Sequence, residues 1–365
     1  MIAGEEVERI LGDFGPRDGA ATLVVVSGLH GNEPAGVLAS QRVAAALATR
    51  CAALSGRVVL LAGNLPALRS GVRYLDRDLN RAWTTERIRE LRNGSPGAGG
   101  VRDGQGTGTV EDAEQRALLE ILDGVVRDAE GPVYLLDLHT TSGAGAAFST
   151  VADTLRNRAL ALAFPVPVVL GLEEMVEGTL HDWMGQMGAV TLAFEGGQHQ
   201  ESAAVDRAEA ALWIMLAATG VADATQAPEV AAARRLLEDE HRGLPRVVEM
   251  RYRHPLAPGD RFRMRPGYRN FQPIRKGEAV ASDLDGDVLA PESARILMPL
   301  YQEKGSDGFF VVREFKPFWL RVSEGARRAR LDRVVHWLPG IRRHPSEPHS
   351  LVVDRRVARW YALQI

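Results

Sequence analysis

The sequence predicts an α/β fold with a mixed, largely parallel sheet and flanking helices, followed by a small β-barrel-like domain. Over the first two thirds of the 365 residues, short apolar runs alternate with longer segments rich in Ala, Leu and Arg, which is the rhythm of βαβ units. Hydrophobic residues make up 45% and charged residues 25%, as in an ordinary globular protein with enough length for two modest domains. After residue 243 the pattern changes to short strands separated by Pro/Gly turns.

Candidate strands in the first part are apolar at successive positions, as expected for strands that are buried on both faces of a sheet. They are Leu23–Val26, Val58–Ala62, Val133–Leu138, Val166–Leu170 and Val190–Phe194. Candidate helices have apolar residues at spacings of three and four, so that one face of each helix can cover the sheet. They are Pro34–Thr49, Val110–Asp128, Thr154–Ala163, Thr179–Gln186, Ser202–Ala218 and Glu229–Glu240.

The run from Asn93 to Thr109 holds seven glycines. So much backbone freedom favours a surface loop or a lid over a packed element. A phosphate-binding loop is the competing interpretation, but the spacings GxGxxG and GxxxxGK followed by Ser or Thr are absent. We therefore do not expect nucleotide binding.

The second part is predicted to consist of short strands with tight turns. They are Val247–Tyr252, Arg261–Met264, Glu278–Ser282, Val288–Ala290, Arg295–Pro299 and Phe309–Arg313. We expect an α/β domain over residues 1–243 and a β-rich C-terminal domain over residues 244–365. The turn at Asp285-Gly286 is similar to that of lipoyl-type barrels but carries no lysine to modify, so a carrier function is not expected. The Arg-rich stretch Arg321–Ile365 has no assigned place in this scheme.

Charge and cysteine content exclude several classes of protein. Lys and Arg number 44 against 47 Asp and Glu, so the net charge is −3 and we expect no binding to nucleic acid or to an anionic membrane. The single cysteine, Cys51, excludes an internal disulfide and a Cys-rich metal cluster, and a cytoplasmic location is expected. No export signal is visible, and the most apolar later stretch, Ala208–Gly220, is too short to span a membrane.

The predicted strand Leu23–Val26 runs into the segment SGLHGNEP, which places His30 and Glu33 where a buried strand gives way to a helix. This is a favourable position for an active site in an α/β protein. An imidazole and a carboxylate suit Zn²⁺ as a borderline metal. Because a chance HxxE is expected in about half of such chains, a purely structural role stays open for the spacing alone.

Two further predicted strands lead into polar residues. Val133–Leu138 is followed by His139, the natural third metal ligand, and Asp137 lies on the same strand face, where it can hydrogen-bond the imidazole and orient it. A strand-end histidine satisfied by the main chain is the alternative. Val190–Phe194 is followed by Glu195. Two histidines and a carboxylate leave a coordination position open, as hydrolytic zinc sites require, and Glu195 fits the base that takes a proton from the attacking water.

Between these motifs lies the dense polar run RYLDRDLNR, from Arg73 to Arg81. Its arginines are suited to clamp a carboxylate with two hydrogen bonds or to stabilise a developing oxyanion. A solvated charged loop is the alternative interpretation.

The motifs, in this order, resemble those of the succinylglutamate desuccinylase/aspartoacylase family of the zinc carboxypeptidase superfamily. The resemblance covers residues of about 20–220 through GLHGNEPAG, RYLDRDLNRAW, LDLHTTSG and GAVTLAFEGG, and the following β-rich part is similar in kind to the one that this family appends. The resemblance implies a zinc carboxypeptidase-like fold and one Zn²⁺ per chain, held by His30, Glu33 and His139. It also implies that Glu195 acts as general base and then as general acid for the departing amine.

For the substrate, the resemblance implies that Arg73 polarises the scissile carbonyl and that Asn80 and Arg81 hold the carboxylate of the amino-acid part. The implied substrate is a small N-acyl amino acid or a related amide, and the implied reaction is N-deacylation by a metal-dependent hydrolase. Mn²⁺ and Co²⁺ suit the same nitrogen and oxygen ligands, so the native metal stays open.

The chain departs from the family pattern at residues that choose the substrate. Aspartoacylases carry an arginine about ten residues before the catalytic glutamate, where this chain has the segment WMGQ, so selectivity for N-acetylaspartate is not expected. Trp183 and Met184 in this segment either line an apolar acyl pocket or belong to the core. The family also donates a tyrosine from its C-terminal domain, for which only Tyr268 and Tyr301 are available here.

An acidic segment with Glu173, Glu174 and Glu177 either favours a cationic substrate group or is solvated. His199 follows closely after Glu195, but it and the remaining histidines show no spacing typical of a metal site. We therefore leave them outside the expected site.

Two other functions stay open. A zinc carboxypeptidase acting on peptides or on cell-wall-type amides would share the metal and the base. A non-catalytic protein that binds a carboxylate would use Arg73 and Arg81 but has no need of Glu195. A small-molecule substrate is the expected partner, and a homo-oligomer stays open.

Overall fold

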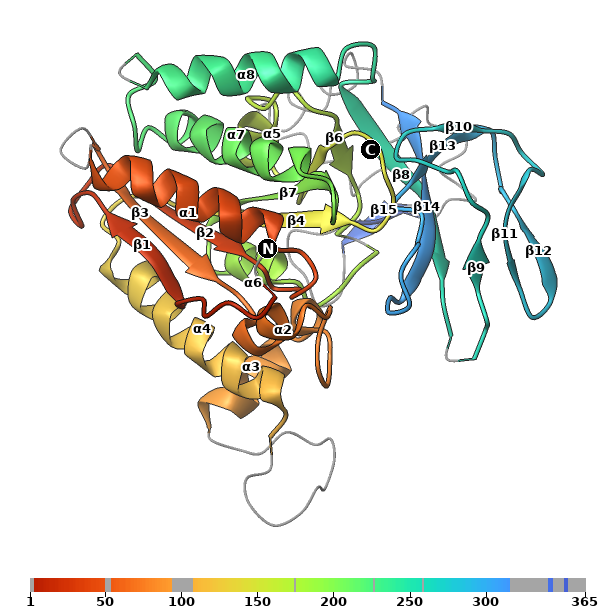
Figure 1. Cartoon of the computed structure of the whole chain (residues 1–365), viewed down its shortest axis with the longest axis horizontal. Helices are drawn as coiled ribbons and strands as arrows, with labels where there is room; N and C mark the ends of the chain where they lie inside the picture. Colours follow the sequence, from red (N-terminus) through yellow and green to blue (C-terminus); the bar gives the residue numbers. More distant parts are fainter. Residues whose placement is uncertain are drawn as a thin grey trace. The chain divides into compact units, whose positions relative to one another are not determined.

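Eleven strands of the described chain form one mixed sheet in the computed structural model, with the order β1-β3-β2-β4-β7-β5-β6-β8-β14-β13-β10 (Figure 1). The structure describes residues 3–49, 54–93, 108–173, 175–225, 227–257, 259–315, 341–343 and 351–353. Residues 1–314 make up one unit and residues 315–365 a second. In the second unit, the short strands β15 (Ile341–Arg343) and β16 (Leu351–Val353) pair antiparallel. Apart from these two strands, the Arg-rich C-terminal stretch lies outside the described residues, and so does most of the Gly-rich run. The expectations for both segments concern residues that the structure does not describe.

The centre of the sheet is parallel. Strand β2 (Thr22–Ser27) lies between β3 (Arg57–Ala62) and β4 (Val133–Thr141), and β4 pairs with β7 (Val190–Gln198), all in parallel. Every residue of β2 and β3 is buried, as predicted for their apolar runs Leu23–Val26 and Val58–Ala62. The edge strand β1 (Ile10–Phe14) pairs antiparallel with β3. The mixed sheet predicted from the sequence is therefore confirmed, and its parallel part lies at the centre.

Helices cover both faces of this sheet. On one side, α1 (Ala35–Ala48) packs against α7 (Ala203–Ala218), which in turn packs against α8 (Pro228–Glu240). On the other side of β1, β2 and β3 lies α4 (Val110–Asp128), as Figure 1 shows. There Val24 and Val26 share an apolar cluster with Leu118 and Leu122. The shorter helices are α2 (Leu65–Ser70), η2 (Leu79–Arg81), α3 (Thr85–Arg92), α5 (Leu155–Ala161) and α6 (Leu180–Gln186).

Two predicted strands are longer than their apolar runs. The sequence predicts ends at Leu138 and Phe194, whereas β4 continues to Thr141 and β7 to Gln198. The extension arises because the two strands pair with each other beyond the apolar part, with His139 opposite Glu195. Both polar side chains therefore stand on a hydrogen-bonded sheet rather than on a loop.

Other elements have no counterpart in the predictions. They are β1, α2, η2, α3, β10 (Pro273–Ile274) and the short strand β5 (Phe148–Val151). Strand β5 pairs antiparallel with β7 and parallel with β6 (Val168–Leu170). Strand β5 has the sequence FSTV, which is too short for a pattern to be recognised.

The predicted β-rich C-terminal part is present as two sheets. Four strands extend the main sheet, namely β8 (Val247–Pro255), β14 (Asp307–Glu314), β13 (Ala294–Leu297) and β10 (Pro273–Ile274). A separate three-stranded sheet contains β12 (Gly286–Leu289), β11 (Ala279–Asp283) and β9 (Arg263–Met264). One buried cluster, with Val280, Ile296 and Val311, joins them. Since β6 pairs with β8, hydrogen bonding runs through the predicted boundary at residue 243, which stays a prediction.

The polar run from Arg73 to Arg81 is held by the start of α4. Glu111 is fully buried and accepts hydrogen bonds from the main-chain nitrogens of Leu75 (2.7 Å), Asp76 (3.0 Å) and Arg77 (3.3 Å). It also accepts a bond from the side chain of Asn64 at 3.1 Å. This run is consequently an anchored segment and not the solvated loop that was the alternative.

Among the described residues, no helix combines the length and the apolar character needed to cross a membrane.

We predict that Glu111→Ala lowers the free energy of unfolding by about 2–4 kcal/mol, because it leaves several buried donors without an acceptor. Urea denaturation followed by circular dichroism measures this change. Glu120→Ala, an exposed position on the same helix, serves as the control and is expected to change stability by less than about 0.5 kcal/mol. Equal stability of the two variants would contradict the anchoring role.

Candidate functional site

Polar side chains from three adjacent strands meet at one edge of the sheet. Strands β2, β4 and β7 are parallel neighbours, so their carboxyl ends lie together. His30 and Glu33 follow β2, and His139 and Glu195 stand near the ends of β4 and β7. The four residues line one cavity of about 130 Å³.

The turn after β2 depends on two glycines. Gly28 has a φ of 70°, which favours glycine. Gly31 packs on the backbone of α2, where a Cβ atom would lie 2.0 Å from the carbonyl carbon of Ala67. From this turn Glu33 reaches β4, where its Oε2 accepts a hydrogen bond from the main-chain nitrogen of Thr140 at 2.9 Å.

His30, Glu33 and His139 converge on one point. The Nδ1 atom of His30 lies 2.9 Å from Oε1 of Glu33, and Nδ1 of His139 lies 3.1 Å from Oε2. All three residues are buried, and their ligand atoms lie within 4.8 Å of one another. Two imidazoles and one carboxylate are a donor set that fits Zn²⁺ and similar divalent ions. The three predicted ligands thus form a candidate metal centre.

The second nitrogen of each imidazole contacts a carboxylate. Nε2 of His30 lies 2.9 Å from Oδ1 of Asp78, and Nε2 of His139 lies 3.0 Å from Oδ2 of Asp137. Such pairs fix the ring orientation and leave Nδ1 to face a metal. The position of Asp137 is the one expected from the sequence. Asp78 was not singled out within the polar run, because only the fold shows that it reaches His30.

Arg73 lies beside the candidate metal centre. Its Nε and Nη2 atoms donate to Oδ2 of Asp78 at 3.2 and 2.9 Å, and its Nη1 atom lies 3.5 Å from Oε1 of Glu33. Burial favours the neutral side chain, but the charges of Asp78 and Glu33 outweigh it and raise the pKa of Arg73. A fixed positive charge therefore stands at the cluster.

Asn80 and Arg81, both expected at the substrate carboxylate, differ in how freely they can bind it. Oδ1 of Asn80 accepts a hydrogen bond from the main-chain nitrogen of Leu180 at 2.9 Å, and Nδ2 lies 3.2 Å from Nε2 of His139. Arg81 donates from Nη1 to the carbonyl oxygen of Asn80 at 2.8 Å, while Nη2 lies 3.9 Å from Oδ2 of Asp307. Arg81 thus keeps donors for a ligand, whereas the amide of Asn80 is engaged by the protein.

Glu195 is buried and one of its oxygens is available. Within the described part of the chain, Oε2 has no hydrogen-bond partner. Burial raises the pKa of Glu195 to about 8, with the charges of Glu33 and Asp137 acting in the same direction and His139 opposing them. A carboxyl group with this pKa can take up and release a proton near neutral pH.

The rest of the cavity wall was mostly missed by sequence reasoning. Much of it comes from two segments without a local motif, which contribute Leu172, Glu173, Val176, Thr179 and His181 and several residues between Met298 and Phe310, and the remainder comes from Thr140, Thr141, Ser142, Thr150, Ala193 and His199. His199, which the sequence analysis left outside the site, also lines the cavity, where Nδ1 contacts Oγ1 of Thr140 at 2.7 Å and Nε2 contacts Oε1 of Gln302 at 3.1 Å. Trp183 and Met184 belong to the apolar core and do not line the cavity.

The tyrosines considered as substitutes for the family residue lie elsewhere. Tyr301 donates to the carbonyl oxygen of Arg265 at 2.7 Å, and Tyr268 donates to Glu278 at 2.6 Å. Neither lines the cavity.

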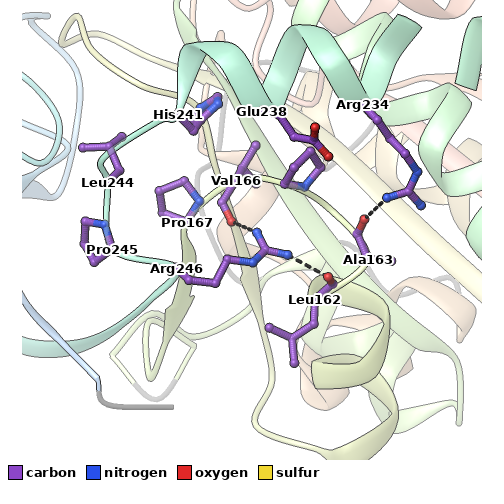
Figure 2. Close-up of a pocket in the computed structure, with 11 residues that line it drawn as sticks. Leu162, Ala163, Val166, Pro167, Arg234, Glu238, His241, Leu244, Pro245 and Arg246 are labelled. Atoms are coloured by element: carbon purple, nitrogen blue, oxygen red, sulfur yellow. Dashed lines mark hydrogen bonds between the residues drawn. The ribbon is translucent and has the colours of Figure 1, made fainter. Parts of the chain in front are cut away.

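A second cavity, of about 360 Å³, lies between the end of α5 and the end of α8 (Figure 2). Its arginines bind main-chain oxygens: Arg234 donates to Ala163 at 2.9 Å, and Arg246 donates to Leu162 at 2.7 Å and to Val166. These carbonyls follow α5 and need partners once the helix has ended. The two arginines of this cavity therefore have a structural role as partners of main-chain oxygens. The cavity shares no residue with the candidate metal centre.

Comparison with known proteins places this geometry in a family. The model of the succinylglutamate desuccinylase/aspartoacylase catalytic domain matches residues 20–218. Over 66 residues the chain is 44% identical to the succinylglutamate desuccinylase of Photorhabdus laumondii, covering 18% of this chain and 20% of that enzyme. The alignment with this curated relative thus spans about a fifth of its length.

Solved structures share the fold at low sequence identity. A succinylglutamate desuccinylase/aspartoacylase from Rhodobacter sphaeroides has a TM-score of 0.57 and 21% identity, covering 83% of this chain and 87% of that one. An ectoine utilization protein from Ruegeria pomeroyi has a TM-score of 0.57 and 19% identity, covering 82% and 86%. Because the family model covers more than half of the residues, the chain belongs to the succinylglutamate desuccinylase/aspartoacylase family, whose named members are hydrolases of amide C–N bonds.

Proposed function

We propose that the protein is a zinc-dependent amidohydrolase that removes the acyl group from a small N-acyl amino acid or a related amide. The observation that carries this proposal is a buried carboxyl group, Glu195, whose Oε2 has no hydrogen-bond partner among the described residues and which lines the same cavity as the convergent ligands His30, Glu33 and His139. A protein that only binds a carboxylate has no need of this combination.

The electrostatics of the cluster support a bound cation. Three carboxyl groups, those of Glu33, Asp78 and Asp137, lie around the two imidazoles, and two guanidinium groups, Arg73 and Arg81, lie near Asp78. Buried negative charge in excess of its counter-charges is costly unless a cation compensates it. When bound by His30, Glu33 and His139, a zinc ion would supply Lewis-acid chemistry toward the scissile carbonyl and the attacking water.

In the proposed reaction, Glu195 accepts a proton from water as its oxygen attacks the acyl carbon. The same carboxyl group then gives that proton to the amine nitrogen as the C–N bond breaks, so the products are a carboxylic acid and an amino acid. Arg73 stabilises negative charge on the carbonyl oxygen, since its guanidinium already faces Glu33. Arg81 holds the substrate carboxylate with its remaining donors.

The expected role of Asn80 changes with its contacts. Its Oδ1 atom accepts a hydrogen bond from the first residue of α6, so we propose that Asn80 holds the start of α6 beside His139 rather than the substrate carboxylate.

We predict that Glu195→Gln lowers kcat by about 10²–10⁴-fold, because the amide cannot accept a proton, and leaves metal affinity nearly unchanged. Amine release from N-acyl amino acids and metal titration measure the two effects. Glu303→Gln, an exposed position outside the cavity lining, is the matched control. Full turnover in Glu195→Gln would refute the proposed mechanism, and turnover of short peptides alone would assign a carboxypeptidase instead.

We also predict that Asp78→Asn and Asp137→Asn each weaken zinc affinity by about 10–100-fold, because the imidazoles lose their charged partners. Competition with a chromophoric chelator gives the affinity without a turnover assay. Asp239→Asn, at an exposed position on α8, controls for the loss of one surface charge. Native affinity in both cluster variants would rule out the proposed centre.

A further inference from the structure

Beyond the candidate metal centre, one part of the cavity wall is apolar, whereas the rest carries hydroxyl, amide, carboxyl and imidazole groups. Leu172, Val176 and Phe310 are buried and belong to one apolar cluster, and Met298 packs against that cluster. Leu300 and Ala193 complete this part of the lining. An apolar wall gains free energy from an apolar ligand group and offers no hydrogen bond to a charged one.

Positive charge is scarce in the cavity. Among the described lining residues, Arg73 and Arg81 are the two arginines, and none is a lysine. Arg73 is engaged by Asp78 and Glu33, as described above. Among the described lining residues, Arg81 is therefore the guanidinium placed to pair with a carboxylate of the substrate, and this part of the lining provides for one such group.

Two further carboxyl groups, those of Glu173 and Asp307, also line the cavity. Oε1 of Glu173 lies 3.2 Å from Nδ1 of His181, and Asp307 pairs with Nε of Arg253 at 2.5 Å. Burial lowers the pKa of His181 to about 4, so this imidazole is uncharged near neutral pH and does not add a cation. A second substrate carboxylate that enters the apolar part of the cavity would therefore lie beside apolar side chains and near Glu173, without an unengaged guanidinium from that part of the described lining.

We propose that the cavity selects substrates with a single carboxylate and a short apolar group, in the acyl chain or in the amino-acid side chain, and disfavours substrates with a second carboxylate. This inference rests on the proposed deacylase function and concerns the substrate class of the same site. The apolar group would contact Leu172, Val176 and Phe310, which belong to one buried cluster.

The first test measures kcat/KM of the zinc-loaded protein for four substrates by amine release. N-acetylleucine and N-butanoylalanine carry one carboxylate, whereas N-acetylaspartate and N-succinylalanine carry two. We expect at least one substrate of the first pair to exceed both of the second pair by about 100-fold or more, because an unpaired carboxylate must be buried in the second pair.

The second test changes the charge of the wall. Glu173→Gln keeps an acceptor for His181, and it is expected to raise kcat/KM for N-acetylaspartate relative to N-acetylleucine by about tenfold. Glu177→Gln is the matched control, since it removes the same charge from an exposed position in the same segment that does not line the cavity. The native preference is expected to persist in this control.

A binding measurement keeps the test independent of turnover. Calorimetry with zinc-loaded Glu195→Gln protein compares N-acetylleucine with N-acetylaspartate, and tighter binding of N-acetylleucine is expected. The inference on substrate class is overturned if N-acetylaspartate or N-succinylalanine is hydrolysed as fast as the substrates with one carboxylate. It is also overturned if N-acetylaspartate binds as tightly as N-acetylleucine. In both cases the deacylase proposal stands. If the metal-loaded protein hydrolyses none of the four, the proposed function fails and this inference with it.

Discussion

The parallel pairing of β2, β4 and β7 is the constraint on which the site depends. Parallel neighbours place their carboxyl ends at one edge of a sheet, so three segments far apart in sequence deliver His30, His139 and Glu195 to one place. The register that sets His139 opposite Glu195 extends both strands beyond their apolar parts. A loop would leave these side chains freer, whereas hydrogen-bonded strands fix them at low entropic cost during each reaction cycle.

Buried charge is organised in layers around this edge. Glu33 lies between two imidazoles, and each imidazole is backed by a carboxylate, from Asp78 or Asp137. The segment that carries Asp78 and Arg73 is in turn tied to α4 through Glu111. Removal of one member leaves its partner buried without compensation, so stability, ring orientation and metal affinity are coupled in this part of the molecule.

Much of this arrangement could be predicted from the sequence, and the missing parts have physical reasons. Long apolar runs and helical spacing predicted β2, β3, α1 and α4, because burial dictates those patterns. The grouping of His30, Glu33 and His139 followed from strand ends that meet. The engaged amide of Asn80 and the apolar wall with Leu172, Met298 and Phe310 depend on contacts between distant segments, which leave no local pattern.

The central claim is that the convergent histidines and glutamate hold one catalytic divalent ion. The most direct test is the metal content of the purified protein, measured on the same sample as amine release from N-acyl amino acids before and after chelation. The account predicts about one zinc per chain, loss of hydrolysis with the chelator and recovery when zinc is returned. A protein that retains no metal after reconstitution, or that hydrolyses its substrate equally well without metal, would contradict it.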